Sequence, residues 1–584
     1  MSRRLTRGTL RIAVYASLAL LPIAASAHGA SSAGPPRAAA TAATERVLLV
    51  TFSDRPDLST GEARLAGLGA VHPSVPEVGV WELHPRNAST ARAAALTRDH
   101  VLRAEWSRIR TSDVLTSPRP APPATLPPVT LPEPTDPFYA QPSPNQQWSL
   151  HRGNWAPGLA AYDRPTIAIL DSGIDSTHEE WRAPGLLVWP RSTIRHVNSA
   201  EDISDRGHGT HVAGIAAAPA NGIGIVGVAP ASPTSAVPGL SKVMSVQIAD
   251  TLGQSSDTTM IRGIRWAVNH GAKVINISSG GTGYLQAFQD TVDWAFRQGA
   301  LIVASVGNEG LEDNPVNYPA GYDHVIGVGA QCDGIVELLD CPTAFGRARF
   351  SNFNYSVDLL APGVNIPSTI PLAVTEGQFA PGYGFKSGTS MAAPYVAGAV
   401  ALVFASHPGI SPSQVTRILQ TTASRGAAGR NSSEGWGIVN PLAAAQAPAP
   451  VDDLGEVNDD VKWLARHDTL SIARTPTRFE ARADFNDDPI DTYPVSLRKG
   501  QRLKVTIAAK AGRLGVYVFR PSTPSVSPTV LSDRQFNAKL LGSTRRSTPG
   551  TRAVVIRARE SGRHFVAVYA AAGGGEYSLK IQRL

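Results

Sequence analysis

Gly388–Pro394 reads Gly-Thr-Ser-Met-Ala-Ala-Pro, and a strongly apolar run continues from it to Ala405. This pattern predicts a helix that opens at Ser390. A serine at the start of a helix is most often a cap. Two short stretches upstream favour a chemical role instead, because they supply a base and a carboxylate.

The two upstream stretches contain an aspartate and a histidine. Ala168–Gly173 reads Ala-Ile-Leu-Asp-Ser-Gly, an apolar strand pattern that ends on Asp171. Gly207–Gly214 reads Gly-His-Gly-Thr-His-Val-Ala-Gly, and His208 opens a helix there. A serine hydroxyl needs a base to take its proton, and the base needs a carboxylate to hold its tautomer. Asp, His and Ser in this chain order form one known arrangement of such a triad.

With these three stretches the chain resembles the subtilisin-like serine proteases (subtilases) over about residues 45–445. The resemblance implies a serine endopeptidase that forms an acyl-enzyme. In that reading Ser390 attacks the peptide carbonyl, His208 moves the proton and Asp171 orients His208. No catalytic cofactor is expected.

A fourth stretch supplies an oxyanion donor. Ser305–Gly310 reads Ser-Val-Gly-Asn-Glu-Gly after an apolar strand pattern and resembles the subtilase segment whose asparagine holds the oxyanion, which makes Asn308 the candidate. His211 lies on another face of the His208 helix. We expect it to be structural, because one base is enough.

The resemblance also implies two walls that bind an extended peptide. Ile277–Gly281 resembles the primary-specificity wall, and Leu252–Ser255 resembles the opposite strand. No acidic residue stands beside Asn317, near the expected pocket floor, so the primary pocket is predicted to prefer apolar side chains or to be broad. The candidate substrate-binding residues are Gly253, Ser278, Ser279, Gly280, Gly281 and Asn317.

Ala218–Gly227 resembles the calcium-binding loop of the family, in which carbonyl and amide oxygens face a hard cation. The carboxylate expected after the catalytic strand is a glutamate here rather than an aspartate. A metal-free turn stabilised by glycines is the alternative. The candidate calcium ligands are Pro219, Asn221, Ile223, Ile225, Glu180 and Asp136.

Strand and helix patterns alternate from Pro165 to Ala423, which predicts an α/β region with a parallel sheet covered on both faces. Before this region, strand and helix patterns that end in a strand over Val101–Ile109 predict a small ferredoxin-like α+β unit. It resembles the inhibitory propeptide of subtilases. After the region, short strands separated by Gly-rich turns predict an all-β sandwich that resembles a pre-peptidase C-terminal domain.

The 584 residues therefore divide into five predicted parts. These are a signal peptide (1–27), an inhibitory propeptide (45–113), a Pro-rich linker (114–144), a subtilisin-like catalytic domain (145–445) and a C-terminal β-sandwich (460–584). The first part has four arginines before an apolar stretch and a small-residue cleavage motif, so we expect secretion to the outside of the cell. A short membrane anchor is the alternative, and Sec or twin-arginine export both stay open.

Removing residues 1–27 lowers the formal net charge from +7 to +3, because they hold four arginines and no acidic residue. No Lys/Arg stripe with interleaved aromatics is present, so nucleic acid is not an expected partner. The expected partners are polypeptide substrates and the chain's own propeptide, with no membrane span in a monomeric mature chain. The two cysteines, Cys332 and Cys341, form one loop disulfide in an exported protein or are two buried thiols.

Two other functions are weighed against the protease. A serine esterase would be expected to carry a Gly-x-Ser-x-Gly elbow, and Gly388–Ala392 lacks the last glycine. A binding protein on a protease scaffold would be expected to have lost a catalytic residue, and none of the three triad positions is replaced.

Overall fold

The computed structural model describes most of the chain from residue 46 onward. The described residues are 46–112, 115–116, 134–140, 147–153, 155, 164–232, 242–334, 341–426, 428–450, 457–458, 460–461, 464, 470, 477–484, 489–526, 533–544, 550–571 and 574–584. The predicted signal peptide lies outside them, as does most of the predicted Pro-rich linker.

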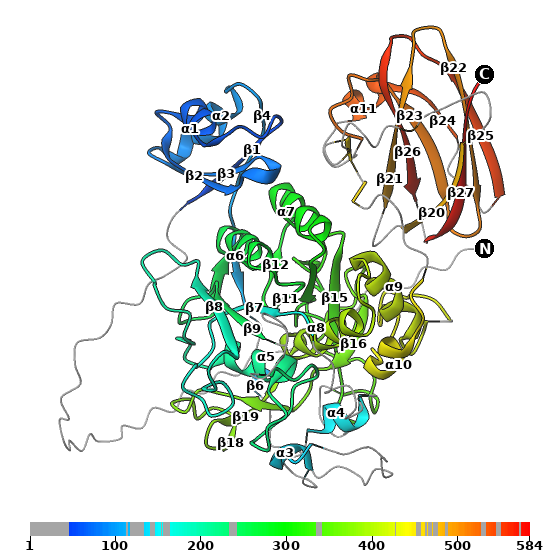
Figure 1. Ribbon diagram of the computed structural model, residues 1–584. Helices are drawn as coiled ribbons and strands as arrows, with labels where there is room; N and C mark the ends of the chain where they lie inside the picture. The colour runs from blue at the N-terminus through cyan, green and yellow to red at the C-terminus, as the bar shows by residue number, and fades with distance from the viewer. Residues whose placement is uncertain are drawn as a thin grey trace, which may run out of the picture. The chain divides into compact units, whose positions relative to one another are not determined.

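The largest sheet has seven strands among the described residues, in the order β16-β15-β13-β11-β7-β9-β8, and every pairing in it is parallel (Figure 1). The strands are β7 (Ile167–Asp171), β8 (Leu187–Ser192), β9 (Val243–Gln247), β11 (Val274–Ile277), β13 (Leu301–Ser305), β15 (Val325–Gln331) and β16 (Leu359–Pro362). All residues of β7, β9, β11 and β13 are buried, as expected for strands covered on both faces. The predicted α/β region with a parallel sheet is confirmed.

Helices cover this sheet, and two of them begin at or next to a predicted catalytic residue. They are α5 (His208–Ala217), α6 (Asp257–Asn269), α7 (Gln286–Arg297), α8 (Thr389–Ser406), α9 (Pro412–Thr422) and α10 (Pro441–Gln446). α5 packs against α8, and α6 packs against α7. A capping box begins α6, in which the Ser256 hydroxyl accepts a hydrogen bond from the Thr259 N–H.

The helix α8 is apolar on all sides because it lies in the core. Of the described helices it alone has the length and apolar composition to cross a membrane, and 83% of that stretch is buried inside the protein. Such a helix is expected within a large core. It begins at Thr389, one residue before the predicted start, and its N-cap is Gly388 rather than Ser390.

Shorter elements surround the sheet. They are α3 (Pro137–Ala140), α4 (Trp148–Arg152), β10 (Gln254–Ser256), β12 (Gly281–Thr282), β14 (Asn317–Tyr318), β17 (Ile366–Thr369), β18 (Gln378–Ala380) and β19 (Tyr383–Ser387). β12 pairs with β14, and β19 lies between β17 and β18.

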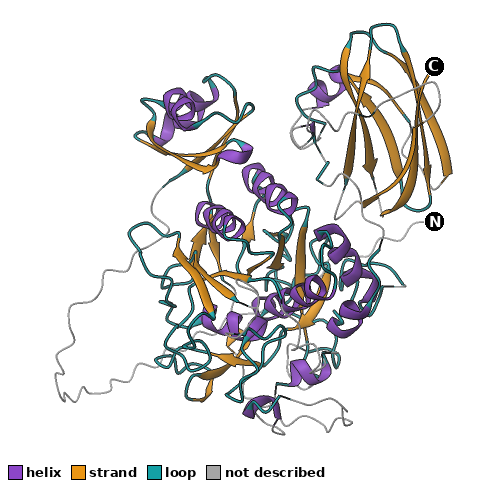
Figure 2. Ribbon diagram, in the orientation of Figure 1, coloured by secondary structure: helices purple, strands orange, loops and turns teal. Residues whose placement is uncertain are grey.

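Residues 46–112, here called the N-terminal module, form an antiparallel sheet in the order β2-β3-β1-β4 with two helices (Figure 2). Its elements are β1 (Leu48–Phe52), α1 (Leu58–Leu65), β2 (Gly69–Val75), η1 (Pro76–Val78), β3 (Val80–Pro85), α2 (Ala88–Leu96), β4 (Val101–Trp106) and β5 (Ile109–Thr111). The predicted strand over Val101–Ile109 is wrong in extent. It ends at Trp106, and β5 leaves this sheet to pair with β10.

Residues 457–584, here called the C-terminal module, contain two four-stranded antiparallel sheets in the orders β20-β27-β22-β25 and β21-β26-β23-β24. Their elements are β20 (Thr477–Asp484), β21 (Ile490–Leu497), β22 (Arg502–Ala509), β23 (Leu514–Phe519), α11 (Asp533–Lys539), β24 (Leu540–Ser543), β25 (Gly550–Arg557), β26 (Gly562–Ala570) and β27 (Gly574–Arg583). One apolar cluster includes Val505 and Leu579 of the first sheet with Val516 and Val566 of the second.

Candidate active site

Asp171 and His208 form a buried hydrogen-bonded pair. Asp171 is the last residue of β7 and His208 the first of α5, and each side chain is 2% exposed. His208 Nδ1 lies 2.7 Å from Asp171 Oδ1. Because a carboxylate can only accept, Nδ1 is the donor and Nε2 is left as the basic nitrogen. Nε2 is buried and has no hydrogen-bond partner among the described residues.

Glycines allow the two loops of this pair to meet. A Cβ at Gly209 would lie 2.2 Å from the Gly173 carbonyl oxygen, so the α5 backbone approaches the end of β7 as closely as a glycine permits. Gly207 has φ +60°, a left-handed conformation that turns the chain into α5. Local backbone requirements therefore account for the glycines of the histidine stretch.

Ser390 stands in the first turn of α8 and is fully buried. Its hydroxyl donates to the Ser278 carbonyl oxygen at 3.0 Å, while its own carbonyl accepts from the Ser278 hydroxyl at 2.9 Å. This pair of bonds ties the nucleophile candidate to the wall that follows β11. A rotation about the Cα–Cβ bond redirects the hydroxyl without moving the backbone.

Asn308 lies just after β13 and faces the start of α8. Its Oδ1 accepts from the Thr389 N–H at 2.9 Å and from the Thr389 hydroxyl at 3.0 Å. These two donors fix the amide orientation, because only the oxygen can accept. The Nδ2 side of the amide is thereby turned away from Thr389. The sequence did not single out Thr389 for this role, although it stands beside Ser390.

His211 lies on another face of α5, and its surroundings are structural. Its Nε2 lies 3.1 Å from the carbonyl oxygens of both Ile366 and Gly384. Burial holds the pKa of His211 well below its ordinary value, so the ring is neutral. These contacts fasten α5 to β17 and β19.

A second buried carboxylate, Asp202, binds the residues next to the Asp171–His208 pair. It was not identified from the sequence. It accepts from the Ser172 hydroxyl at 2.8 Å and from the Thr210 N–H at 2.9 Å. The Ser172 hydroxyl in turn accepts from the Gly209 N–H at 2.9 Å. This network joins the end of β7 to the start of α5. No local pattern marks Asp202, because its partners come from two other segments.

The last residues of the N-terminal module lie between the two predicted peptide-binding walls. Thr111 exchanges two hydrogen bonds with Gly280, of 3.0 and 2.9 Å. On the other side β5 pairs antiparallel with β10, and the Ser112 N–H donates to the Gly253 carbonyl at 3.2 Å. Further along, β6 (Leu115–Thr116) pairs with β19, three residues before Ser390. Residues 109–112 therefore lie in the predicted cleft as an extended strand.

The other predicted substrate-binding residues lie in the same region. Gly281 begins β12, where a Cβ would come within 3.3 Å of Arg110 Cδ. Asn317 begins β14, and its Nδ2 donates to Glu309 Oε2 at 3.3 Å. The expectation that no acidic residue stands beside Asn317 is therefore wrong, because Glu309 follows β13 and reaches Asn317 from another segment. Ser279 is buried, and its hydroxyl has no hydrogen-bond partner among the described residues. Gly253, Gly280 and Gly281 thus contact the strand that contains Thr111, whereas Asn317 lies on β14, which pairs with β12.

The predicted calcium loop brings Asp136 and Glu180 to one turn. Asp136 Oδ1 accepts from the N–H groups of Asn221 and Gly222, at 3.0 and 3.1 Å. Glu180 accepts from the Ile225 N–H and from the Asn221 side-chain amide, at 3.0 and 3.1 Å. Burial raises the pKa of Glu180 to about 8 and also raises the pKa of Asp136.

The donor set of this turn is only partly that of a calcium site. Asn221 Oδ1, a predicted ligand atom, accepts from the Ile223 N–H at 2.8 Å. Asp136 Oδ2 is buried and has no hydrogen-bond partner among the described residues, so this oxygen is available to bind a cation. No group of three or more His, Cys, Asp or Glu side chains suited to a metal occurs among the described residues. A cation here would depend on carbonyl oxygens, including those of Pro219, Ile223 and Ile225.

Cys332 and Cys341 are joined in a disulfide, with their Cα atoms 5.7 Å apart. Both are buried in a small apolar cluster with Phe350 and Val364. The bridge closes the loop after β15.

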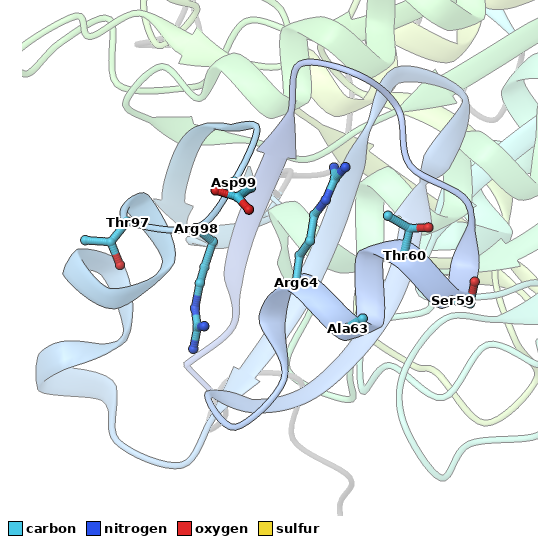
Figure 3. A pocket seen from close by; sticks show the side chains of 7 residues that line it. All are labelled: Ser59, Thr60, Ala63, Arg64, Thr97, Arg98 and Asp99. Carbon is cyan, nitrogen blue, oxygen red and sulfur yellow. The ribbon is translucent and has the colours of Figure 1, made fainter.

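A surface pocket lies elsewhere, on α1 and the end of α2 of the N-terminal module (Figure 3). It is lined by Ser59, Thr60, Ala63, Arg64, Thr97, Arg98 and Asp99. No predicted site residue is among them, and Arg64 is engaged by Asp54 through two hydrogen bonds of 2.8 Å. We assign this pocket no function.

Comparison with known proteins agrees with this geometry. Residues 163–437 match the model of the subtilase family, Peptidase_S8. Subtilisin of Bacillus pumilus is 38% identical over 282 residues, which are 48% of this chain and 90% of that protein. Fervidolysin of Fervidobacterium pennivorans is 31% identical over 437 residues, 70% of this chain and 59% of that protein. The crystal structure of fervidolysin, described as a keratinolytic enzyme related to subtilisin, superposes with a TM-score of 0.60 at 20% identity, covering 91% of this chain and 93% of that one.

Proposed function

Since the chain belongs to the subtilase family and is a serine endopeptidase, we propose that it is secreted as a zymogen and cleaves peptide bonds with Asp171, His208 and Ser390. The observation that carries this assignment is the 2.7 Å bond from His208 Nδ1 to Asp171 Oδ1, which leaves Nε2 as the base. Ser390 attacks the peptide carbonyl, and His208 takes its proton and later gives it to the leaving amine.

The tetrahedral oxyanion is held by Asn308 and by the backbone N–H of Ser390. Asn308 suits this role because Thr389 occupies its Oδ1, so that its Nδ2 remains the donating end. The hydroxyl of Ser390, directed at the Ser278 carbonyl, rotates toward His208 Nε2 before attack.

The N-terminal module acts as the inhibitory propeptide. In support, β5 occupies the cleft between β10 and Gly280, as an extended substrate would. The strand reaches Ser112, and the chain next pairs with β19 at Leu115, so the bond that is cut on maturation lies between these two residues. Sequencing the N-terminus of the mature protein tests this range.

Replacing Ser390 with Ala tests the protease and the zymogen together. Casein hydrolysis should fall by about a millionfold, the loss already measured for the nucleophile of subtilisin itself. The variant should keep the precursor size and should not react with a serine-directed sulfonyl fluoride. Ser406→Ala is the matched control, because this serine ends the same helix and, among the described residues, its hydroxyl bonds only within that helix. Unchanged processing and casein cleavage in Ser390→Ala would refute the proposal.

A structural calcium ion belongs to the proposal and has its own test. Asp136 and Glu180, with the carbonyl oxygens of Pro219, Ile223 and Ile225 and the amide oxygen of Asn221, would hold it. Asp136 Oδ2, which has no hydrogen-bond partner among the described residues, supports it. Calcium should raise the unfolding temperature of a chelator-treated sample, and Asp136→Asn should abolish that rise. An unchanged temperature would favour a metal-free turn.

We further propose that the mature enzyme is an extracellular monomer and that the C-terminal module is of the pre-peptidase C-terminal type. Its two antiparallel sheets around one core support the second point. Sedimentation of the mature protein, recovered from the medium of secreting cells, tests the first.

A further inference from the structure

Arg110 is the buried residue of β5, the strand that lies in the cleft. Its side chain is 0% exposed, as is that of its ion-pair partner Asp257. Nε donates to Asp257 Oδ1 at 2.7 Å, and Nη2 lies 2.7 Å from the same oxygen. A fully buried arginine is rare in proteins unless its charge is paired.

Three backbone carbonyls complete the enclosure of this guanidinium. Nη1 donates to the carbonyls of Gly281 and Thr282, the latter at 3.1 Å, and Nη2 donates to that of Gly283 at 3.2 Å. With the carboxylate, these acceptors engage all five N–H groups of a guanidinium. The planar fork of an arginine fits this arrangement, whereas a lysine has only three donors at one point.

The groups that surround the Arg110 guanidinium belong to a helix and a strand of the catalytic region. Asp257 is the first residue of α6, and the three carbonyls belong to β12 and the residue after it. The second oxygen of Asp257 accepts from the Arg108 N–H at 2.8 Å, a main-chain contact that any residue except proline can make. The Asp257 carboxylate therefore binds the side chain of Arg110 and the backbone N–H of Arg108.

The main-chain pairing of β5 with β10 and Gly280 does not depend on side chains, so it gives no selectivity by itself. We propose that the pocket formed by Asp257 and the carbonyls of residues 281–283 selects arginine in peptide substrates, at the position that Arg110 holds two residues before Ser112. This specificity is separate from that of the primary pocket. The inference rests on the proposed function, in which β5 lies as a substrate does.

When the N-terminal module leaves, the Asp257 carboxylate loses the guanidinium with which it pairs. Burial raises the pKa of Asp257, and the charge of Arg110 opposes that rise. A substrate arginine restores the ion pair, whereas a neutral side chain leaves Asp257 and three carbonyls unpaired. Removing one partner of a buried ion pair at an interface strongly weakens binding, because the other charge is left unpaired.

The experiment uses the mature wild-type enzyme and a quenched fluorescent peptide with the sequence of residues 107–116, Ser-Arg-Ile-Arg-Thr-Ser-Asp-Val-Leu-Thr. Variants replace the residue matching Arg110 with Gln or Lys. The control replaces the one matching Arg108, whose side chain is exposed and bonds only to the Tyr284 carbonyl among the described residues. That control removes the same charge from the peptide without touching the enclosed site.

We expect kcat/KM to fall about a hundredfold for Gln at the Arg110 position, somewhat less for Lys, and less than about threefold for the control. Asp257→Asn should reduce the ratio of kcat/KM for the Arg peptide to kcat/KM for the Gln peptide by at least about tenfold. Should this variant not fold, the peptide series on the wild-type enzyme still decides. Equal cleavage of the Arg and Gln peptides, with casein digested normally, would overturn the inference alone. If the wild type digests neither casein nor any peptide and resists the sulfonyl fluoride, the proposed function fails and the inference falls with it.

Discussion

The N-terminal and C-terminal modules flank the same catalytic region but are stabilised in different ways. Among the described residues, nine form the buried apolar cluster of the N-terminal module, whereas nineteen form the main cluster of the C-terminal module. The N-terminal module adds ion pairs with the catalytic region, in which Glu82 meets Arg262 and Arg103 meets Asp290. A module with a small core and many external ion pairs is suited to folding in contact with its partner and to being released.

The largest expected effect is a difference in stability between isolated fragments. Residues 46–112 alone should be largely unfolded at 25 °C, since a chain of this length buries only about 60% of its surface and here also loses its docking contacts. Residues 457–584 alone should unfold cooperatively, with a free energy of unfolding on the order of 5 kcal/mol. Circular dichroism during urea titration measures both. Equal stability of the two fragments would abolish the distinction.

The second prediction is that replacing Arg110 weakens the binding of the N-terminal module to the catalytic region. Arg110→Gln in the released module should raise its inhibition constant about a hundredfold, because Asp257 then stays buried without a cation. Arg108→Gln is the control and should change the constant less than about threefold. Similar inhibition by both variants would mean that docking depends on the main-chain pairing alone.

The third prediction concerns pH and Glu82. Burial alone would raise the pKa of Glu82, but His84 and Arg262 outweigh it, so the pKa in the docked state lies below its ordinary value near 4.5. This docking contribution is therefore complete above about pH 4.5 and is lost as the pH falls through the lowered pKa. Inhibition should weaken in acid, and Glu82→Gln should remove part of that pH dependence while weakening inhibition about tenfold at pH 7.

The control for this prediction is Glu77→Gln. Glu77 also faces an arginine of α6, Arg265, but that pair is about one third exposed on each side. Its removal should change the inhibition constant less than about fivefold, because surface ion pairs contribute little. An equal effect of both substitutions would show that burial at Glu82 is unimportant.

How far the sequence predicts this molecule depends on how local the determinants are. The alternation of apolar strands with helices predicts the parallel sheet, because each strand is a continuous buried run such as Leu301–Ser305. The stretches around Asp171, His208 and Ser390 are just as local. Each ends a strand or opens a helix, so the sequence shows both the residue and its setting.

Other features depend on partners far along the chain. Arg110 and Asp257 are 147 residues apart, and nothing near either one predicts the other. The end of β4 at Trp106 was missed for the same reason, since β5 is fixed by its pairing with β10 rather than by its own pattern. Asp202 is likewise recognisable only through Ser172 and Thr210.

The last prediction is the smallest and concerns the C-terminal module alone. The Tyr577 hydroxyl donates to Asp491 Oδ2 at 2.5 Å and lies 2.7 Å from the Tyr493 hydroxyl, and all three side chains are buried. Tyr577→Phe should lower the free energy of unfolding of fragment 457–584 by about 1–3 kcal/mol, because the buried carboxylate loses a donor. Casein hydrolysis by the full enzyme should be unchanged. A parallel loss of proteolysis would show that the C-terminal module supports the catalytic region, and the contrast between the two modules would then be one of degree.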